Sequence, residues 1–196
     1  MPTRDPSNLT LGVGYLYRAP LGTAEPADNT AHVAPAAPWV DLGFTDDGIT
    51  LTEEADWETL TVDQVLDDVD ARLTGRRVTV ETALAEPTLD AWKAAINDRA
   101  TLATVAAAGA GTAAAQTLTP GDSNMTAPTR CMIILDGFAP GGFARRLLMR
   151  RVLQIENIEH ASSKTDKGLI PVKFQSFYVS PSVRPYKIID QTAAAV

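Results

Sequence analysis

Two histidines and a single cysteine are the residues of this chain best suited to metal binding or nucleophilic chemistry. His32 and His160 lie far apart, and neither has a second His, Cys or Glu at the short spacing that zinc sites use. Cys131 precedes the apolar run 132–135, a setting typical of a buried strand residue and not of a reactive thiol. These residues predict neither a metal site nor a catalytic cysteine.

Adjacent carboxylates are the remaining candidates for acid–base chemistry. The three pairs are Asp46 with Asp47, Glu53 with Glu54, and Asp67 with Asp68. Neighbouring side chains on a strand point to opposite faces, so such pairs rarely converge on one substrate. The run from Asp46 to Gly48 supplies only a fragment of a calcium loop and is better explained as a turn. Because no nucleophile elbow or phosphate-binding glycine motif accompanies them, we expect no catalytic residue, metal, cofactor or enzyme activity.

A basic cluster is the best candidate for a charged binding surface. It consists of Arg145, Arg146, Arg150 and Arg151. On a strand, the first and last of these would lie on the face opposite the other two, so the four would form no single stripe. Aromatic residues do not interleave with them, as binding of single-stranded nucleic acid would require. Three interpretations stay open: ion pairs within or between subunits, a solvated surface, and nucleic acid binding.

Charge is distributed unevenly along the chain. The net charge is −7, yet residues 1–98 hold 18 acidic and 6 basic residues, whereas residues 99–196 hold 6 acidic and 11 basic residues. This asymmetry fits complementary faces on successive subunits, a nucleic-acid patch, or two unrelated solvated surfaces. No run approaches the roughly 20 apolar residues of a membrane span, and the first residues lack the apolar core of a signal peptide. We expect a protein made in a cytoplasm and not bound to a membrane.

The hydrophobic pattern indicates one domain, 1–196, that is mainly β (α+β). Alternating or fully apolar runs predict strands near 9–19, 39–52, 76–84, 131–135, 143–156, 169–179 and 186–189. Thr88 is placed to cap a single helix, whose apolar face combines Leu89, Trp92, Ala95 and Ile96 and which ends near 97–99. We expect an antiparallel β-sandwich or barrel-like core with one flanking α-helix and long loops.

Four segments are expected outside this core. They are a flexible N-terminal arm (1–8), an acidic loop (53–73), an Ala/Thr/Gly-rich loop or loosely ordered hairpin (100–128), and a frayed C-terminus (190–196). Within the acidic loop, a strand followed by a long excursion also fits, and a helical turn at 62–69 stays open as an alternative. In the strand at 143–156, simple alternation puts Leu147 and Met149 on one side and Leu148 and Val152 on the other.

Two runs near the N-terminus have a distinctive order of parts. The first, 11–26, reads LGVGYLYRAPLGTAEP, and the second, 39–52, reads WVDLGFTDDGITLT. A strand, a Pro- and Gly-containing turn, a Pro-rich spacer, an aromatic anchor and a second strand follow one another. This order resembles the N-terminal signature of the major tail tube proteins of long-tailed, siphovirus-like bacteriophages, especially those of actinobacteria.

The resemblance implies a structural virion protein that self-assembles as stacked hexameric rings into a tail tube. The implied partners are further copies of the chain, the tape measure protein, the tail terminator and the tail-tip or distal tail proteins. DNA would cross the lumen without specific binding, and the protein would reside in the virion tail after assembly in the host cytoplasm. Thr79 and Glu81 are expected to face the lumen.

Contacts between subunits or rings are expected at charged residues. The candidates are Asp46, Asp47, Glu53, Glu54, Asp67, Asp68, Arg145, Arg146, Arg150 and Arg151. Two other functions stay open: another virion component, such as a head–tail joining or capsid-stabilising protein, and a small ligand-binding β-barrel or hydrolase.

Overall fold

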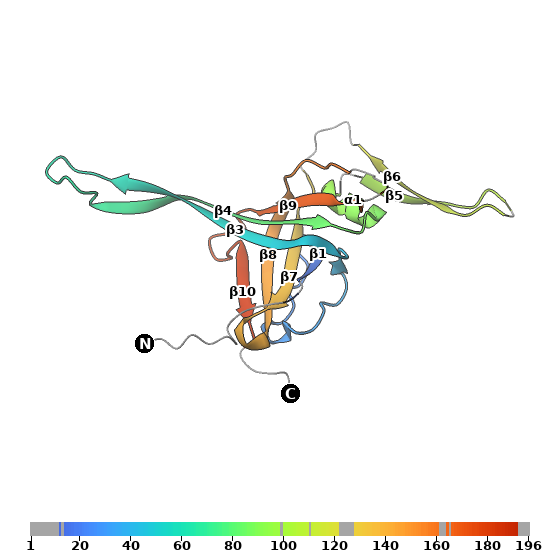
Figure 1. Ribbon diagram of the computed structural model, residues 1–196, viewed down its shortest axis with the longest axis horizontal. Coiled ribbons are helices and arrows are strands. Elements are labelled where there is room, and N and C mark those ends of the chain that lie inside the picture. The colour runs from blue at the N-terminus through green and yellow to red at the C-terminus, as the bar shows by residue number, and fades with distance from the viewer. Residues whose placement is uncertain are drawn as a thin grey trace.

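Figure 1 shows the computed structural model, in which residues 12, 14–98, 100–109, 111–121, 128–160, 164 and 166–191 are described. Within those residues the chain is mainly β, as predicted. In chain order the strands are β1 (Tyr15–Pro20), β2 (Val40–Asp41), β3 (Thr45–Leu60), β4 (Asp70–Leu84), β5 (Ala100–Val105), β6 (Ala115–Pro120), β7 (Cys131–Phe138), β8 (Ala144–Gln154), β9 (Ile170–Ser176) and β10 (Tyr186–Asp190). The helix is α1 (Leu89–Ala95), and short 3-10 turns lie at Asp28–Thr30 and Pro140–Gly142. The predicted N-terminal arm, 1–8, and residues 192–196 of the predicted frayed end lie outside the described residues.

Eight strands form one antiparallel sheet that folds over on itself. Its order is β2-β1-β7-β8-β9-β4-β3, with β10 paired to β8 beside this path. The sheet turns at β8, because residues 145–149 of this strand pair with β10 and residues 152–154 pair with β9. Figure 1 shows β7, β8 and β10 crossing β9, β4 and β3 at a steep angle. The antiparallel, mainly β architecture is confirmed, with one α-helix in the part of the chain that the structure describes.

A β-bulge bends β8 at this turn. Cys131 pairs with Val152 and Ile133 pairs with Met149, so β8 has one residue more than β7 between the two pairs. A bulge bends its strand and increases the local twist. It also brings Val152 to the side of Met149, and both are buried in the same cluster. The prediction of Val152 beside Leu148 is therefore wrong, because simple alternation does not allow for an extra residue.

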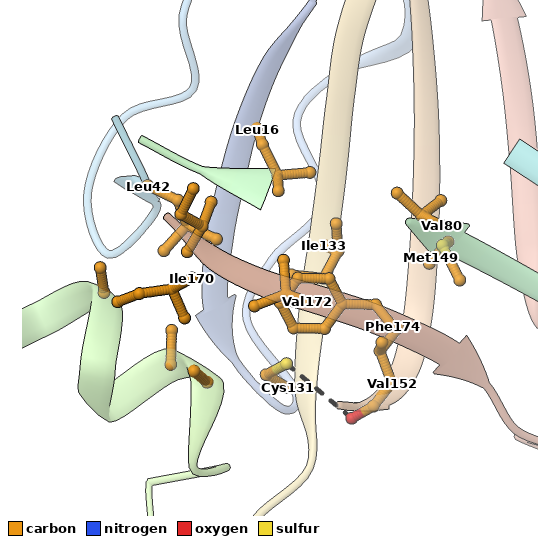
Figure 2. Close-up of a cluster of buried hydrophobic side chains, with 14 of the residues drawn as sticks. Leu16, Leu42, Val80, Cys131, Ile133, Met149, Val152, Ile170, Val172 and Phe174 are labelled. Atoms are coloured by element: carbon orange, nitrogen blue, oxygen red, sulfur yellow. Dashed lines mark hydrogen bonds between the residues drawn. The ribbon is translucent and has the colours of Figure 1, made fainter. Parts of the chain in front are cut away.

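The main core lies between the two crossing groups of strands. Leu16, Val80, Met149 and Phe174 come from β1, β4, β8 and β9, and all four are fully buried. Figure 2 shows these side chains between the strands, with α1 at one side. Full burial of each large apolar side chain contributes roughly 1.5–3 kcal/mol, so this cluster is the main source of stability.

A second, smaller core lies on the other face of β1, β7 and β8. Trp39 packs there against Met132 and Leu148, which brings the Pro-rich segment 21–44 against the sheet. β7 is therefore covered on both faces. The interpretation of 131–135 as a strand buried on both sides is confirmed.

Helix α1 starts where the sequence predicts. The hydroxyl of Thr88 accepts a hydrogen bond from Ala91 N at 3.1 Å, as an N-cap does. The buried face is centred on Ala91 and Ala94, and Trp92 lies at its margin, where it meets the His160 ring edge-on with centroids 5.6 Å apart. In the described part of the chain, no helix has the length and apolar character of a membrane span.

Asn97 joins the end of α1 to the end of β8. Its φ is 57°, in the left-handed region that Asn tolerates better than most residues. Its Nδ2 donates to the backbone oxygen of Gln154 and its Oδ1 accepts from Gln154 N, both at 2.8 Å. Both residues are buried, so this side chain satisfies two polar groups that water cannot reach.

Replacing Asn97 with alanine is expected to lower the free energy of unfolding by about 2–3 kcal/mol, because two buried backbone groups lose their partners. Urea unfolding followed by circular dichroism measures the change. Asn97→Gly is the control, since it accepts positive φ but also lacks the amide, and it should recover less than half of the loss. An alanine variant as stable as the wild type would contradict the assigned role.

The acidic segment 53–73 is part of a long hairpin and not a loop. β3 and β4 pair as far as Leu60 opposite Asp70, and only residues 61–69 form the connecting turn. The pairing is favoured because acids on β3 face arginines on β4. Segment 100–128 contains a second hairpin, in which β5 pairs with β6, while residues 110 and 122–127 lie outside the described residues.

Candidate functional site

The distal parts of β3 and β4, residues 54–77, project from the body as a two-stranded hairpin, here called the arm (Figure 1). Arg77 Nη1 lies 3.2 Å from Glu54 Oε2, and Arg72 Nη2 lies 2.7 Å from Glu58 Oε2. These side chains are all more than half exposed, so each pair contributes less than about 1 kcal/mol. The pairs specify the register of the arm without giving it a core.

The two faces of the arm differ in chemistry. One face carries the ion pairs described above. The other carries the apolar strip, defined as Ala55, Trp57, Ala71 and Leu73, with Thr59 and Arg76 beside it. Trp57 and Leu73 are directly opposite each other, with 63% and 48% of their surface exposed. Nearer the body, the same face carries Val78 and Val80, which are buried in the main core. The strip therefore continues the core-facing side of the sheet into solvent.

The root of the arm is attached to β10. The Tyr186 hydroxyl donates a hydrogen bond to Glu53, and this bond is the main cause that raises the pKa of Tyr186. The guanidinium of Arg76 lies 5.7 Å from the centroid of the Tyr186 ring, and its Nε is 3.7 Å from Glu53 Oε1. Cation–π and ionic contacts at one point thus fix the direction in which the arm leaves the body.

The β5–β6 hairpin projects from the opposite side of the body (Figure 1). Residues 100–121, here called the uncharged hairpin, contain no Asp, Glu, Lys or Arg. Among the described residues, β5 and β6 pair only with each other, so the outer edge of each strand is free. Natural proteins usually protect such edges with charges or proline, because free edges pair with other chains. The uncharged hairpin has only Pro120, at one end.

The acidic residues predicted at interfaces lie in three places. Asp46 and Asp47 are at the start of β3. Lys167 Nζ lies 2.7 Å from Asp46 Oδ1. The turn predicted at Asp47 is part of a bulge, in which Asp47 has a φ of 60°. Glu53 and Glu54 are at the root of the arm and already have partners within the chain. Asp67 and Asp68 lie exposed at the tip of the arm.

The four arginines of the basic cluster bind different partners within the chain. Arg145 forms two hydrogen bonds with Asp190, which raise the pKa of Arg145 and lower that of Asp190. Arg150 binds Glu25, with 2.9 Å between Nη2 and Oε2, and Arg151 donates to the backbone oxygen of Tyr178 at 2.9 Å. Of the interpretations left open, ion pairing within the subunit describes the contacts of Arg145, Arg146 and Arg150, whereas the contact of Arg151 is a hydrogen bond to a backbone oxygen.

Arg146 forms a buried ion pair with Asp136. Its Nε and Nη2 donate to the two carboxylate oxygens, both at 2.6 Å, and Nη2 also donates to the backbone oxygen of Val33 at 2.7 Å. Only 1% of the Arg146 side chain is exposed. Burial raises the pKa of Asp136, against the hydrogen bonds from Arg146, which lower it. Arg146 therefore cannot contact another subunit, because its side chain is buried.

The predicted lumen residues lie side by side on the sheet face opposite the core. Glu81 is exposed and its Oε2 is 3.0 Å from Lys173 Nζ on β9. Thr79 is on the same face but only 4% exposed, between Thr52 and Gln175 of the neighbouring strands. A surface contact at this face would therefore involve Glu81 and Lys173 more than Thr79.

No residues converge as a metal or nucleophilic site in the described part of the chain. No group of three or more His, Cys, Asp or Glu side chains there could hold a metal ion. Cys131 is buried, and burial raises the pKa of its thiol, although nearby Arg18 lowers it. His32 Nδ1 lies 3.1 Å from Gln191 Nε2, and His160 packs against Trp92.

The arm is the feature that sequence reasoning missed. Its signal is present as charges of opposite sign at mirrored positions around the turn, with Glu54 matching Arg77 and Glu58 matching Arg72. Such cross-strand pairs are typical of antiparallel strands. The apolar strip leaves a weaker signal, because an extra residue on β4, Thr74, lies between the pairs Asp56–Gly75 and Trp57–Leu73 and shifts the alternation of that strand.

A family model described as phage tail tube protein matches residues 1–180. No curated protein matches the chain.

Proposed function

We propose, from the premise that this chain belongs to the phage tail tube protein family, that six copies form a ring and that rings stack into the tube through which the genome is delivered. The protein is a structural component of the phage tail tube and is located in the virion tail. Ring size, stacking and genome passage are the parts that we add.

The observation that supports ring formation is the pair of hairpins on opposite sides of the body (Figure 1). A two-stranded hairpin alone is marginally stable in water, and both the arm and the uncharged hairpin lack a covering layer. Neighbouring copies would supply that layer and pair the free edges of β3, β5 and β6. Contacts between opposite sides of identical subunits generate rings when the rotation closes.

A channel that conducts DNA must not bind it tightly. Affinity for DNA comes mainly from Lys and Arg contacts to phosphates, and the protein has a net charge of −7. We place Glu81 at the lumen, with Thr79 beside it, on the sheet face that the subunit's own core does not cover. DNA then passes this surface without specific binding.

The remaining parts of the proposal concern partners and origin. As a tail tube subunit, the protein would contact the tape measure protein inside the tube, and the tail terminator and distal tail proteins at its ends. Assembly would take place in the host cytoplasm. The runs at 11–26 and 39–52 support an actinobacteriophage origin.

Purified protein is expected to form hollow tubes of uniform width as its concentration rises, because edge pairing between copies is governed by mass action. Negative-stain electron microscopy over a range of salt and temperature tests this. Closed rings that never stack would favour a head–tail joining role instead. A monomer under all these conditions would contradict the proposal.

A further inference from the structure

Glu81 and Lys173 face each other on the sheet surface that the core does not cover. They are a register pair of the antiparallel strands β4 and β9, with 3.0 Å between Glu81 Oε2 and Lys173 Nζ. Their side chains are 57% and 32% exposed, so a passing molecule can reach the pair. A hydrogen bond to Glu81 is the main cause that raises the pKa of Lys173. Lys173 therefore keeps its charge at neutral pH, and Glu81 cancels that charge locally.

The arm repeats this arrangement on the same face. Arg77 is opposite Glu54 and Arg72 is opposite Glu58, and each is joined to its partner by the ion pair described above. Arg77 lies on the face of Glu81, because the two are four residues apart in β4 with no register shift between them. Each Lys or Arg that β4 and β9 present on this face thus has a carboxylate directly across from it on the next strand.

Two further arginines lie near this face without changing its charge in the same way. Arg76 lies on the other face of β4, where it contacts Tyr186. Arg151 of β8 donates to the backbone oxygen of Tyr178 at 2.9 Å, and its Nε is buried, so its guanidinium is held against the protein. Glu81 is therefore the acid that decides the net charge of the surface where β4 meets β9.

A free cation matters on a surface that DNA passes. Each Lys or Arg that neutralises a phosphate releases counterions and adds to the affinity for DNA. In a tube, the same position recurs in every subunit of every ring, so one free lysine per subunit becomes a regular array along the channel. One acid per subunit then decides whether the channel holds DNA or lets it pass.

We propose that Glu81 neutralises Lys173 and thereby keeps this face from holding DNA. The inference rests on the proposed function, in which the face lines the lumen, and adds what Glu81 does there. Glu81 acts through Lys173 and need not touch DNA, so it is a positioning residue. Loss of its charge should cause DNA retention only while Lys173 is present. Repulsion of DNA by Glu81 itself would not depend on Lys173.

Nuclease protection of DNA tests this role. Tubes are assembled with a short fluorescent DNA duplex at low salt, treated with a nuclease that digests DNA outside the tube wall, and collected by centrifugation. Glu81→Gln tubes should retain at least about tenfold more DNA than wild-type tubes, and the excess should vanish as salt rises, because phosphate contacts weaken with salt. Circular dichroism and electron microscopy should show the wild-type fold and tubes, since exposed ion pairs contribute little to stability.

Four further variants serve as controls. Lys173→Gln, and the double variant Glu81→Gln with Lys173→Gln, should retain no more DNA than the wild type, because neither leaves a free lysine at this position. Glu81→Ala removes the same charge and should reproduce the gain. Asp28→Asn makes the matched change of an acid to an amide beside Lys187 of β10, where the two side chains are 2.5 Å apart. It should leave the amount of protected DNA unchanged.

The outcomes separate this inference from the proposed function. A gain in Glu81→Gln that the double variant loses supports the inference. No gain, or a gain that persists in the double variant, overturns it and leaves the tube function standing. Failure of both Glu81 variants to form tubes does the same, because it would assign Glu81 to a contact between subunits. DNA that binds Glu81→Gln tubes but is fully digested overturns both the inference and the placement of this face at the lumen. A wild-type protein that forms no tubes overturns the proposed function.

Discussion

Replacing Arg146 with methionine is expected to lower the free energy of unfolding by about 3–5 kcal/mol, because it leaves the Asp136 carboxylate without its buried partner. The same side chain also donates to the backbone oxygen of Val33, so the substitution releases a contact to the segment that covers β7 and β8. Urea unfolding of the monomer, followed by tryptophan fluorescence, measures the loss. A variant within about 1 kcal/mol of the wild type would show that Asp136 is adequately solvated.

The loss in the Arg146→Met variant should depend on pH. Burial already raises the pKa of Asp136 in the folded protein, and removal of the arginine removes the hydrogen bonds that lower it. A carboxyl whose folded pKa is raised adds stability below its unfolded pKa, about 3.9, and loses that contribution as pH rises through the folded pKa. The deficit should therefore shrink as pH falls from 7 towards 4.

A double variant provides the matched control for this prediction. Arg146→Met with Asp136→Leu removes both charges and should recover most of the stability at neutral pH, because apolar side chains replace a buried ion pair with little cost. The double variant should also lose the pH dependence of the single variant. A double variant no more stable than the single one would place the main role of Arg146 in its contact with Val33.

Removing the arm is expected to abolish tube formation while leaving the subunit folded. Replacing residues 56–75 with Asn-Gly joins Ala55 and Arg76, which face each other across the hairpin, through a two-residue turn. The removed residues pack against no core, so the free energy of unfolding should change by less than about 1 kcal/mol. Circular dichroism measures the fold, and electron microscopy measures the assembly.

A variant with a shorter arm distinguishes the strip from the turn. Replacing residues 61–69 with Asn-Gly keeps the apolar strip and joins the paired residues Leu60 and Asp70. It should still form tubes if the strip makes the contact between subunits. Tubes from the variant without the arm would show that assembly depends on other surfaces.

Local signals in the sequence were enough to predict the core elements. The apolar run after Cys131 indicated a strand buried on both faces, and Thr88 marked the start of the helix because capping chemistry acts over one turn. The mainly β architecture followed from such elements.

Features that depend on distant partners could not be predicted in the same way. The acids between Glu53 and Asp70 indicated a solvated loop until their arginine partners on the opposite strand were known. Arg146 was grouped with its neighbours in sequence, although its environment is set by Asp136 and Val33. The cleft lined by Tyr15, Val40 and Phe44 combines three separate segments, at residues 15, 40–44 and 86–91, so no pattern within one of them marks it.

The register between β1 and β7 has a consequence for the order of folding. It joins Tyr15 to Asp136, so the body cannot form until segments more than 100 residues apart have met. The two hairpins join residues that are close in sequence, and local contacts form faster than distant ones. We therefore expect newly made subunits to pair the strands of these hairpins transiently, with free edges, before the body is complete. For assembly as proposed, the yield of tubes would depend on how fast the body closes relative to encounters between unfinished chains.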